Sequence, residues 1–364
     1  MVDAIYIHIP FCVKKCGYCD FLSFQSDEKQ RDRYVDSLVN EIRLYPKIKY
    51  DTIYFGGGTP SLLEPFQIKK ILDELDFDKD TEVTLEVNPK TVTREKLQEL
   101  KNIGINRLSI GIQSFNEKFL KKLGRIHTNS EGIATYELAK EIGFENISID
   151  LMFSLPDQTI DELKEDLDKV FLLNPEHFSI YSLIWEEGTP FYEKLISGEY
   201  EETDNDIEAD MYKMIIERSK ENNYHHYEIS NFCKEGKESR HNTKYWRNKE
   251  YIGVGLGASG YLENIRYKNI SEFSKYFNEI ENKRFPRVEE EIVDNEMLEE
   301  YRHILGLRLL EEGISLSSDE KYFNIYQKLL KNGYIKEVQI ENQERYLLTE
   351  KGLFLANEVF EEFI

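Results

Sequence analysis

Three cysteines near the N-terminus have the spacing of a metal-binding loop. Cys12, Cys16 and Cys19 form a C-x3-C-x2-C pattern within eight positions. Three thiolates on one short loop can bind three corners of an Fe4S4 cube and leave the fourth iron open. Zinc is the competing metal, but a closed structural zinc site needs four ligands. No fourth ligand lies at finger spacing, although Cys233 could serve in principle. The pattern favours an iron–sulfur cluster.

Polar residues and glycines stand where further strands are expected to end. Each has a purely structural alternative: a tight turn for the glycines, a satisfied buried carboxylate for the acids and a solvated helix end for the arginine. Several such residues at successive strand ends are nevertheless typical of a binding site, because catalytic groups of βα barrels gather at the carboxyl ends of the strands. These candidates are Gly57, Gly58, Thr59, Glu86, Gln113, Arg125 and Asp150.

The elements that must position these residues alternate between strand and helix. Near-continuous apolar runs predict parallel strands buried on both faces. Charged, helix-periodic stretches lie between them. The predicted strands are Ala4–Pro10, Asp51–Phe55, Glu82–Val87, Arg107–Gln113, Asn146–Phe153 and His177–Leu183, and the predicted helices are Arg31–Leu44, Phe66–Leu75, Arg94–Lys101, Ser130–Ile142 and Asp161–Leu172. Six strand–helix units predict an α/β fold, an incomplete (β/α)6 TIM-like barrel over residues 1–200.

The pattern changes after about residue 200. Residues 201–292 are expected to form an extension of the barrel, with a helix over Asp206–Glu221. Residues 293–364 are expected to form a mostly helical, winged-helix-like domain with helix Glu320–Lys331, a hairpin (Tyr334–Val338 and Arg345–Leu348) and helix Lys351–Phe360. Residues 319–364 contain nine acidic and six basic side chains, so a DNA-binding role is disfavoured for this domain.

Composition restricts the partners and the setting. The formal net charge of −22 disfavours nucleic acid as a partner, because such a surface repels phosphate backbones. The first eleven residues do not read as a signal peptide, and no apolar run is long enough to span a bilayer. A cytoplasmic protein is therefore expected, where cysteines bind metal more often than they form disulfides.

The cysteine motif resembles the signature of the radical S-adenosylmethionine superfamily. The longer stretch from Tyr6 to Cys12, Tyr-Ile-His-Ile-Pro-Phe-Cys, is similar to the group that contains oxygen-independent coproporphyrinogen III oxidase and the HemW-type heme chaperones. The resemblance implies that the open iron binds S-adenosylmethionine and that the reduced cluster cleaves it to a 5′-deoxyadenosyl radical. It also implies contacts between this cofactor and particular residues: Gly57, Gly58 and Thr59 with the methionine part, Gln113 and Asp150 with the ribose hydroxyls, Arg125 with a carboxylate, and Glu86, Tyr6 and Tyr18 elsewhere in the site. For the two tyrosines, aromatic core packing is the alternative.

Three features distinguish the branches of this group. His241-Asn242-Thr243-Lys244-Tyr245-Trp246 resembles the H-N-x-x-Y-W motif of the heme chaperones, which makes His241 a candidate heme contact. The alternative is a loop histidine beside packing aromatics; His225, His226 and Cys233 are more remote candidates for iron ligation. The oxidase branch carries a further cysteine two positions after the third ligand, where this chain has Phe21, and a longer segment before the motif.

The preferred hypothesis is a heme chaperone with heme as cargo, a 4Fe-4S cluster, S-adenosylmethionine and an unknown heme-acceptor protein. If the cluster is reduced, an electron donor such as a flavodoxin or ferredoxin is implied. The alternative is a coproporphyrinogen III oxidase, and a radical enzyme acting on RNA is disfavoured by charge.

Gly255–Gly260 matches G-x-G-x-x-G, but no βαβ unit surrounds it, so a dinucleotide site is not expected. The resembling group usually has a histidine where this chain has Ser259.

Overall fold

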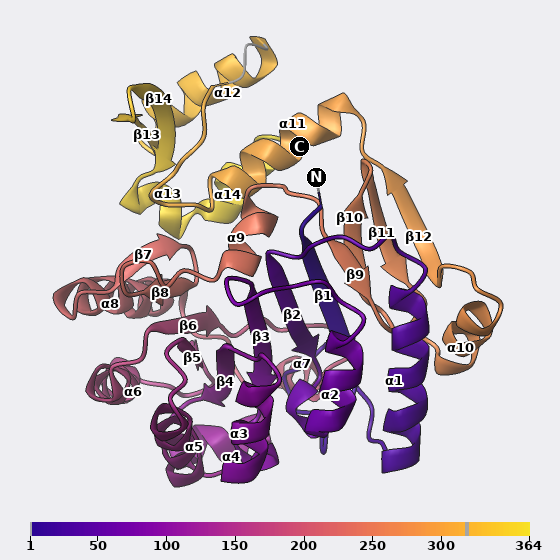
Figure 1. The fold of residues 1–364 in the computed structure, drawn as a ribbon. Coiled ribbons are helices and arrows are strands. Elements are labelled where there is room, and N and C mark those ends of the chain that lie inside the picture. The colour runs from indigo at the N-terminus through magenta and orange to yellow at the C-terminus, as the bar shows by residue number, and fades with distance from the viewer. Residues whose placement is uncertain (1, 317–319) are drawn as a thin grey trace.

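The computed structural model describes residues 2–316 and 320–364. Met1 of the expected first domain and residues 317–319 of the expected C-terminal domain lie outside this range. Within it, the largest sheet is curved and has nine strands in the order β7-β8-β6-β5-β4-β3-β2-β1-β9 (Figure 1). Its strands are β1 (Ala4–Ile9), β2 (Thr52–Gly57), β3 (Glu82–Val87), β4 (Arg107–Gln113), β5 (Ile147–Phe153), β6 (His177–Ser182), β7 (His225–Glu228), β8 (Asn231–Cys233) and β9 (Ile252–Val254).

The six predicted parallel strands are confirmed. β1 to β6 pair in sequence order and in parallel, and each begins and ends within two residues of its expected limits. Three short strands widen this sheet beyond the prediction: β8 pairs antiparallel with β6, β7 pairs with β8, and β9 pairs in parallel with the free edge of β1. The end strands β7 and β9 do not pair with each other, so the barrel is incomplete.

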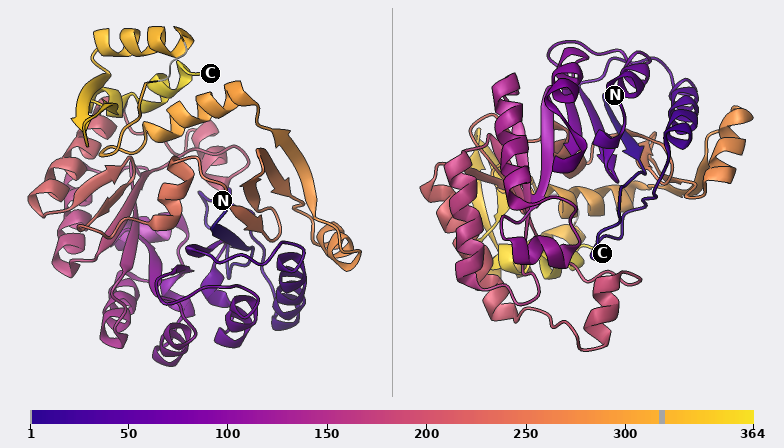
Figure 2. Two further views of the ribbon diagram at one scale, coloured as in Figure 1. Left: turned by 45° about the horizontal axis from the view of Figure 1, so that its top comes forward. Right: turned by 90° about the horizontal axis from the view of Figure 1, so that it is seen from below.

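Helices cover the outer, convex side of this sheet (Figure 2). Most of them begin at a Ser, Thr, Asp or Asn whose side chain accepts a backbone N–H; Thr128 and Thr159, for example, form capping boxes with Glu131 and Glu162. The helices between the parallel strands are α1 (Glu28–Ile42), α2 (Pro65–Leu72), α3 (Arg94–Asn102), α4 (Glu117–Leu123), α5 (Asn129–Ile142) and α6 (Ile160–Leu173). The short helix α4 was not predicted.

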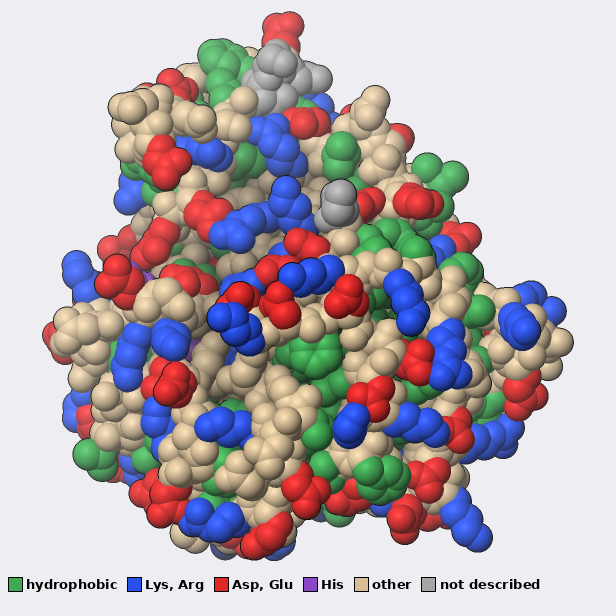
Figure 3. Space-filling view, viewed as in Figure 1, with side chains coloured by type: hydrophobic (Ala, Val, Ile, Leu, Met, Phe, Trp, Pro, Cys, Tyr) green, Lys and Arg blue, Asp and Glu red, His purple; other side chains and the backbone are tan. Residues whose placement is uncertain are grey.

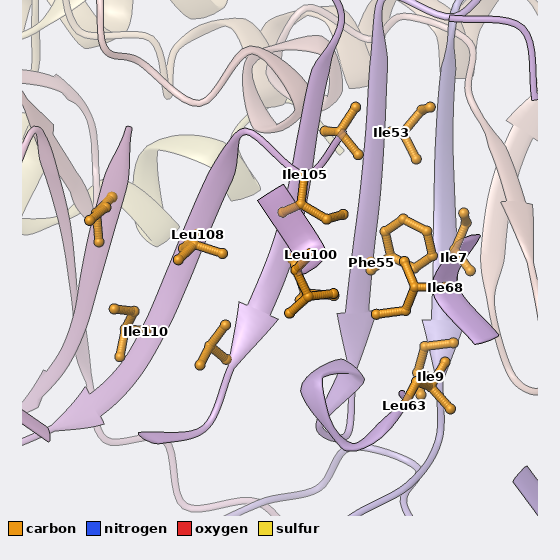
Figure 4. Packing of buried hydrophobic residues seen from close by; sticks show 14 of the residues in the cluster. Ile7, Ile9, Ile53, Phe55, Leu63, Ile68, Leu100, Ile105, Leu108 and Ile110 are labelled. Atoms are coloured by element: carbon orange, nitrogen blue, oxygen red, sulfur yellow. The ribbon is translucent and has the colours of Figure 1, made fainter. Parts of the chain in front are cut away.

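The hydrophobic core lies between the sheet and these helices (Figure 4). Ile7, Phe55 and Leu108 are fully buried there, against side chains such as Ile68 of α2 and Leu100 of α3. Polar residues alternate with the apolar ones and face the inside of the barrel. The expectation that the strands are buried on both faces is confirmed, but the expectation of near-continuous apolar runs was wrong, because the buried inner face is polar.

The chain after β6 forms the extension and the C-terminal domain. The extension contains α7 (Pro190–Ile196), α8 (Asn205–Glu221), α9 (Arg240–Trp246), α10 (Phe273–Glu281) and an antiparallel sheet of β10 (Ser259–Leu262), β11 (Ile265–Asn269) and β12 (Arg287–Ile292). The C-terminal domain contains α11 (Asn295–Gly306), α12 (Glu320–Lys331), the hairpin of β13 (Ile335–Ile340) and β14 (Gln343–Leu348), α13 (Glu350–Phe354) and α14 (Ala356–Glu361).

The C-terminal domain has its own core, built around residues such as Tyr326, Leu329 and Phe363. Its helix–hairpin–helix order agrees with the winged-helix-like prediction, except that the last predicted helix is divided into α13 and α14 at Leu355. On the face shown in Figure 3, acidic and basic side chains are interspersed and form no continuous basic stripe. No helix in residues 2–316 and 320–364 combines the length and the apolar character that a bilayer span requires.

Candidate cluster and cofactor site

The three candidate ligands lie on a loop that runs from β1 to α1, here called the cysteine loop (residues 10–24). Its two ends are tied together, because Cys12 N donates to Phe24 O at 2.9 Å and Phe24 N donates to Pro10 O at 2.8 Å. Its middle is fixed to α4 and α7: Gly17 N donates to Leu123 O, and Gly17 O accepts from Phe191 N. The loop is thus held in one place at the carboxyl end of β1.

All three cysteines of this loop are free and partly exposed. Cys12 Sγ lies 3.4 Å from Thr59 Oγ1, and Arg125 Nη1 donates to Cys16 Sγ at 3.6 Å. Burial raises the pKa of the Cys19 thiol to about 11. Among the described residues, no three His, Cys, Asp or Glu side chains form a group that could hold a single metal ion. Cys233 is fully buried in β8, away from this loop.

The end of β2 packs directly beneath the cysteine loop, and only glycine fits there. Gly57 has a φ of +112°, and a Cβ at this position would lie 2.5 Å from the His8 ring. A Cβ at Gly58 would lie 2.8 Å from Phe11 O and 2.9 Å from Phe11 N. The glycines therefore allow β2 to approach the backbone of the loop that carries the thiols.

A cavity of about 480 Å³ opens at the carboxyl ends of β1 to β6 and brings most of the predicted site residues together. We call it the cluster cavity. Its walls include all three cysteines and every predicted contact except Tyr6 and His241: Tyr18, Gly57, Gly58, Thr59, Glu86, Gln113, Arg125 and Asp150.

Two carboxylates, on β3 and β5, are fixed in the wall of the cluster cavity. Glu86 accepts hydrogen bonds from Tyr54 Oη at 2.9 Å and from Gly57 N at 3.1 Å. Burial raises the pKa of Glu86 to about 7, because desolvation outweighs these two hydrogen bonds. Asp150 accepts from the hydroxyls of Ser109 and Ser148 at 2.8–3.0 Å. Both acids are thus held in place and present oxygen atoms to the cavity.

The carboxyl end of β4 has an irregular backbone that aims its last residue into the cavity. The register shifts between Gly111 and Gln113, and Gln113 has a φ of +72°. Arg125 crosses this end, donating to Gly111 O at 2.6 Å and to Cys16, while its buried Nε has no hydrogen-bond partner among the described residues. The guanidinium therefore connects the cysteine loop to β4.

Tyr6 and His241 lie outside the cluster cavity. Tyr6 donates from Oη to His8 Nδ1 at 3.0 Å on the inner face of β1. His241 is fully buried in α9, with Nδ1 2.8 Å from Thr52 Oγ1 and Nε2 2.7 Å from Tyr245 Oη. Both ring nitrogens are therefore engaged within the protein, and the expected loop is a helix. A heme contact by His241 stays a prediction, as it does for His225 and His226, which do not line the cluster cavity.

Sequence reasoning missed several polar residues that also line the cluster cavity. Arg107 is only 2% exposed, and its Nε has no hydrogen-bond partner within residues 2–316 and 320–364. It shares the inner face with Tyr54, Ser109, Ser179 and Tyr181. The signal was present, since polar residues recur at most of the alternate positions of β2 to β6. The Gly255–Gly260 segment forms the turn after β9 and the start of β10 without a following helix, as expected.

Comparisons with known proteins agree with this geometry. The profile of the Radical SAM superfamily matches residues 6–170. Two proteins named heme chaperone HemW, from Lactococcus lactis subsp. lactis and from Bacillus subtilis, are each 38% identical to this chain; the alignments cover all of it and 97% and 99% of the relatives. The solved structure of coproporphyrinogen III oxidase (HemN) from Escherichia coli has the same fold, with a TM-score of 0.85 at 22% identity over 100% of this chain and 90% of that one. The chain therefore belongs to the HemW family of the radical SAM superfamily.

Proposed function

We propose that this protein is a cytoplasmic heme chaperone that binds heme and passes it to an acceptor protein, while carrying a 4Fe-4S cluster and S-adenosylmethionine. The observation that carries the proposal is the full-length similarity to two heme chaperones at 38% identity. Likeness of fold alone would not distinguish a chaperone from an oxidase, because one fold hosts different activities.

The cysteine loop fits an iron–sulfur cluster. It offers three free thiols that face one cavity, on a backbone fixed at its ends and its middle. Cys12, Cys16 and Cys19 would each hold one iron, and the fourth iron would face the cavity. The Arg125 guanidinium already donates to Cys16 and would offset part of the cluster's negative charge.

The walls of the cluster cavity fit S-adenosylmethionine. Asp150 presents carboxylate oxygens that can accept hydrogen bonds from ribose hydroxyls. Arg125 can contribute its charge to a carboxylate. Asn88 supplies an independent sign of a missing ligand, because its buried Oδ1 lines the cavity and has no donor among the described residues. An ammonium group would satisfy it.

When bound to a reduced cluster, this cofactor supplies a 5′-deoxyadenosyl radical. The protein's part is to position the cofactor and to exclude water. Tyr54 and Gly57 orient Glu86, Ser109 and Ser148 orient Asp150, and the glycine turn keeps the cysteine loop against β2. An electron donor such as a flavodoxin or ferredoxin would be required for reduction.

Anaerobic reconstitution tests both parts of the proposal. Wild-type protein should show 4Fe-4S absorption and a Soret shift on addition of heme, and should not decarboxylate coproporphyrinogen III. Cys12→Ser, Cys16→Ser or Cys19→Ser should lose the cluster, whereas Cys233→Ser, a matched change of a buried cysteine away from the loop, should keep it. Absence of heme binding, or efficient turnover of coproporphyrinogen III, would overturn the chaperone assignment in favour of the oxidase.

A further inference from the structure

A second cavity, of about 700 Å³, adjoins the cluster cavity at the cysteine loop. The two cavities share Lys15, Asp20, Phe21 and Ser23, so this part of the loop forms a wall between them. The remaining walls are the inner face of β1, the end of α9 and the turn from β9 to β10. It therefore lies on the β9 side of the open barrel.

The walls of the second cavity are rich in aromatic side chains. Tyr6, Tyr245 and Tyr251 come from the barrel side, and Phe21 and Phe24 come from the cysteine loop. Phe21 is 62% exposed and Phe24 is 37% exposed, although both belong to a loop that is otherwise firmly anchored. Exposed apolar side chains grouped around a hollow are typical of a binding site for an apolar ligand.

Two lysines with free ammonium groups stand on the same cavity. Lys15 on the cysteine loop and Lys268 on β11 are both exposed. Neither side chain has a hydrogen-bond or ion-pair partner in the described part of the chain. Asp20 is the acidic residue in the same wall, and it too is exposed. The site thus combines flat aromatic surfaces with two cations, which fits a planar, apolar molecule bearing two carboxylates.

We propose that the second cavity is the heme site, with the porphyrin against the aromatic walls and its two propionates paired with Lys15 and Lys268. This inference rests on the proposed function and adds the location and the recognition chemistry. His8 also lines the cavity, but its Nδ1 accepts from Tyr6 Oη, its Nε2 donates to Leu22 O at 3.2 Å, and its ring packs against Gly57. It is therefore held as a structural residue, and we assign it no iron ligation.

This placement gives the protein two adjacent sites with separate tasks. Heme would lie against one side of the cysteine loop while the cluster occupies the other. Because Lys15, Asp20 and Phe21 belong to both walls, a change in the loop on cofactor binding would reach the heme directly. The lysines lie at exposed positions, so the propionate end of the heme would stay open to an acceptor protein.

Hemin titration of charge-reversal variants tests the location. The double variant Lys15→Glu/Lys268→Glu should bind hemin at least about tenfold more weakly than wild type, since two partly exposed ion pairs are replaced by repulsions. Lys268→Glu alone, which leaves the cysteine loop unchanged, should show a smaller loss with full cluster content. Lys249→Glu, an exposed lysine outside both cavities, is the matched control and should bind as wild type does.

Hemin dimethyl ester identifies the recognised group. Without carboxylates, the ester should bind wild type and the double variant with similar affinity. Phe21→Ser should weaken both ligands, because it removes an aromatic wall. If wild type binds hemin at one per chain but the double variant and Lys268→Glu bind it equally well, the location is wrong while the chaperone proposal stands. If wild type fails to bind hemin at all, the proposed function itself fails.

Discussion

Replacing Gly58 by alanine should disturb the cluster site through the backbone alone. The added Cβ would lie 2.8 Å from Phe11 O, about 0.6 Å short of the 3.4 Å at which ordinary contact begins. The obstructing atoms are main chain, so they cannot turn aside as a side chain could. Gly58 N also donates to Ile9 O at 3.0 Å, which prevents β2 from moving away freely. The cysteine loop must therefore shift at the residue that precedes Cys12.

Overpacking of this kind costs about 1–3 kcal/mol of folding free energy. We expect the melting temperature of Gly58→Ala to fall by about 2–10 °C. Iron and sulfide bound per chain after anaerobic reconstitution should fall as well, because the displaced loop carries all three thiols. Differential scanning calorimetry and iron and sulfide analysis measure these two effects on the same samples.

Gly132→Ala provides a matched control. Gly132 lies inside α5, where a Cβ would sit 3.5 Å from Ile112 Cγ2, in ordinary contact. Alanine is the better helix former by about 0.5–1 kcal/mol, so this variant should be as stable as wild type or more stable, with full cluster content. A Gly58→Ala protein with wild-type melting temperature and iron content would refute the steric argument.

Three further predictions concern the site, the extension and the C-terminal domain. Arg125→Lys should keep the fold but weaken S-adenosylmethionine binding at least about tenfold, as measured by calorimetry. The reason is that lysine cannot bridge Cys16 and Gly111 O while it also contacts a carboxylate. Unchanged affinity would contradict this role. Burial raises the pKa of Glu41 from 4.5 to about 7. Its contribution to stability is therefore present below about pH 4.5 and is lost as pH rises through about 7, a change of about 3 kcal/mol in the free energy of unfolding. Urea unfolding at a series of pH values should show this change, and Glu41→Gln should flatten it. Trp246→Leu should cost about 1–2 kcal/mol of folding free energy, because it removes the indole over which the Arg308 guanidinium stacks at 4.2 Å from the ring centroid. Hydrogen exchange should rise in the C-terminal domain while cluster content is unchanged.

Local sequence patterns predicted the six parallel strands because each is a long run of β-branched and aromatic residues between helices with clear boundaries. The short strands were not predictable in this way. Ile252–Val254 is three residues long and contains a glycine, and it becomes a strand only because it pairs with β1. The antiparallel pair β7 and β8 likewise depends on the edge of β6, which no local pattern reveals.

The site was predicted well where residues stand at strand ends, and less well inside the barrel. Glu86 and Asp150 share one cavity, as their positions in the third and fifth strands required. Arg107 was missed because it begins its strand, and because both buried faces of the strands were interpreted as apolar. Counting polar residues at alternate positions would have shown the inner face. His241 illustrates the opposite limit: its residue type allows metal ligation, but its two hydrogen bonds depend on Thr52 and on the helix that it occupies.

The pairing of β9 with β1 has a consequence for synthesis on the ribosome. β1 is made before its two partners in the sheet, and β2, the next strand along the chain, can pair with one of its edges early. The other edge has no partner until Val254 has been made, roughly 10–40 s after β2 at the usual rates of translation. During that interval the nascent chain presents an uncovered strand next to its reactive thiols, so delayed translation or truncation before Ile252 would leave a species prone to self-association.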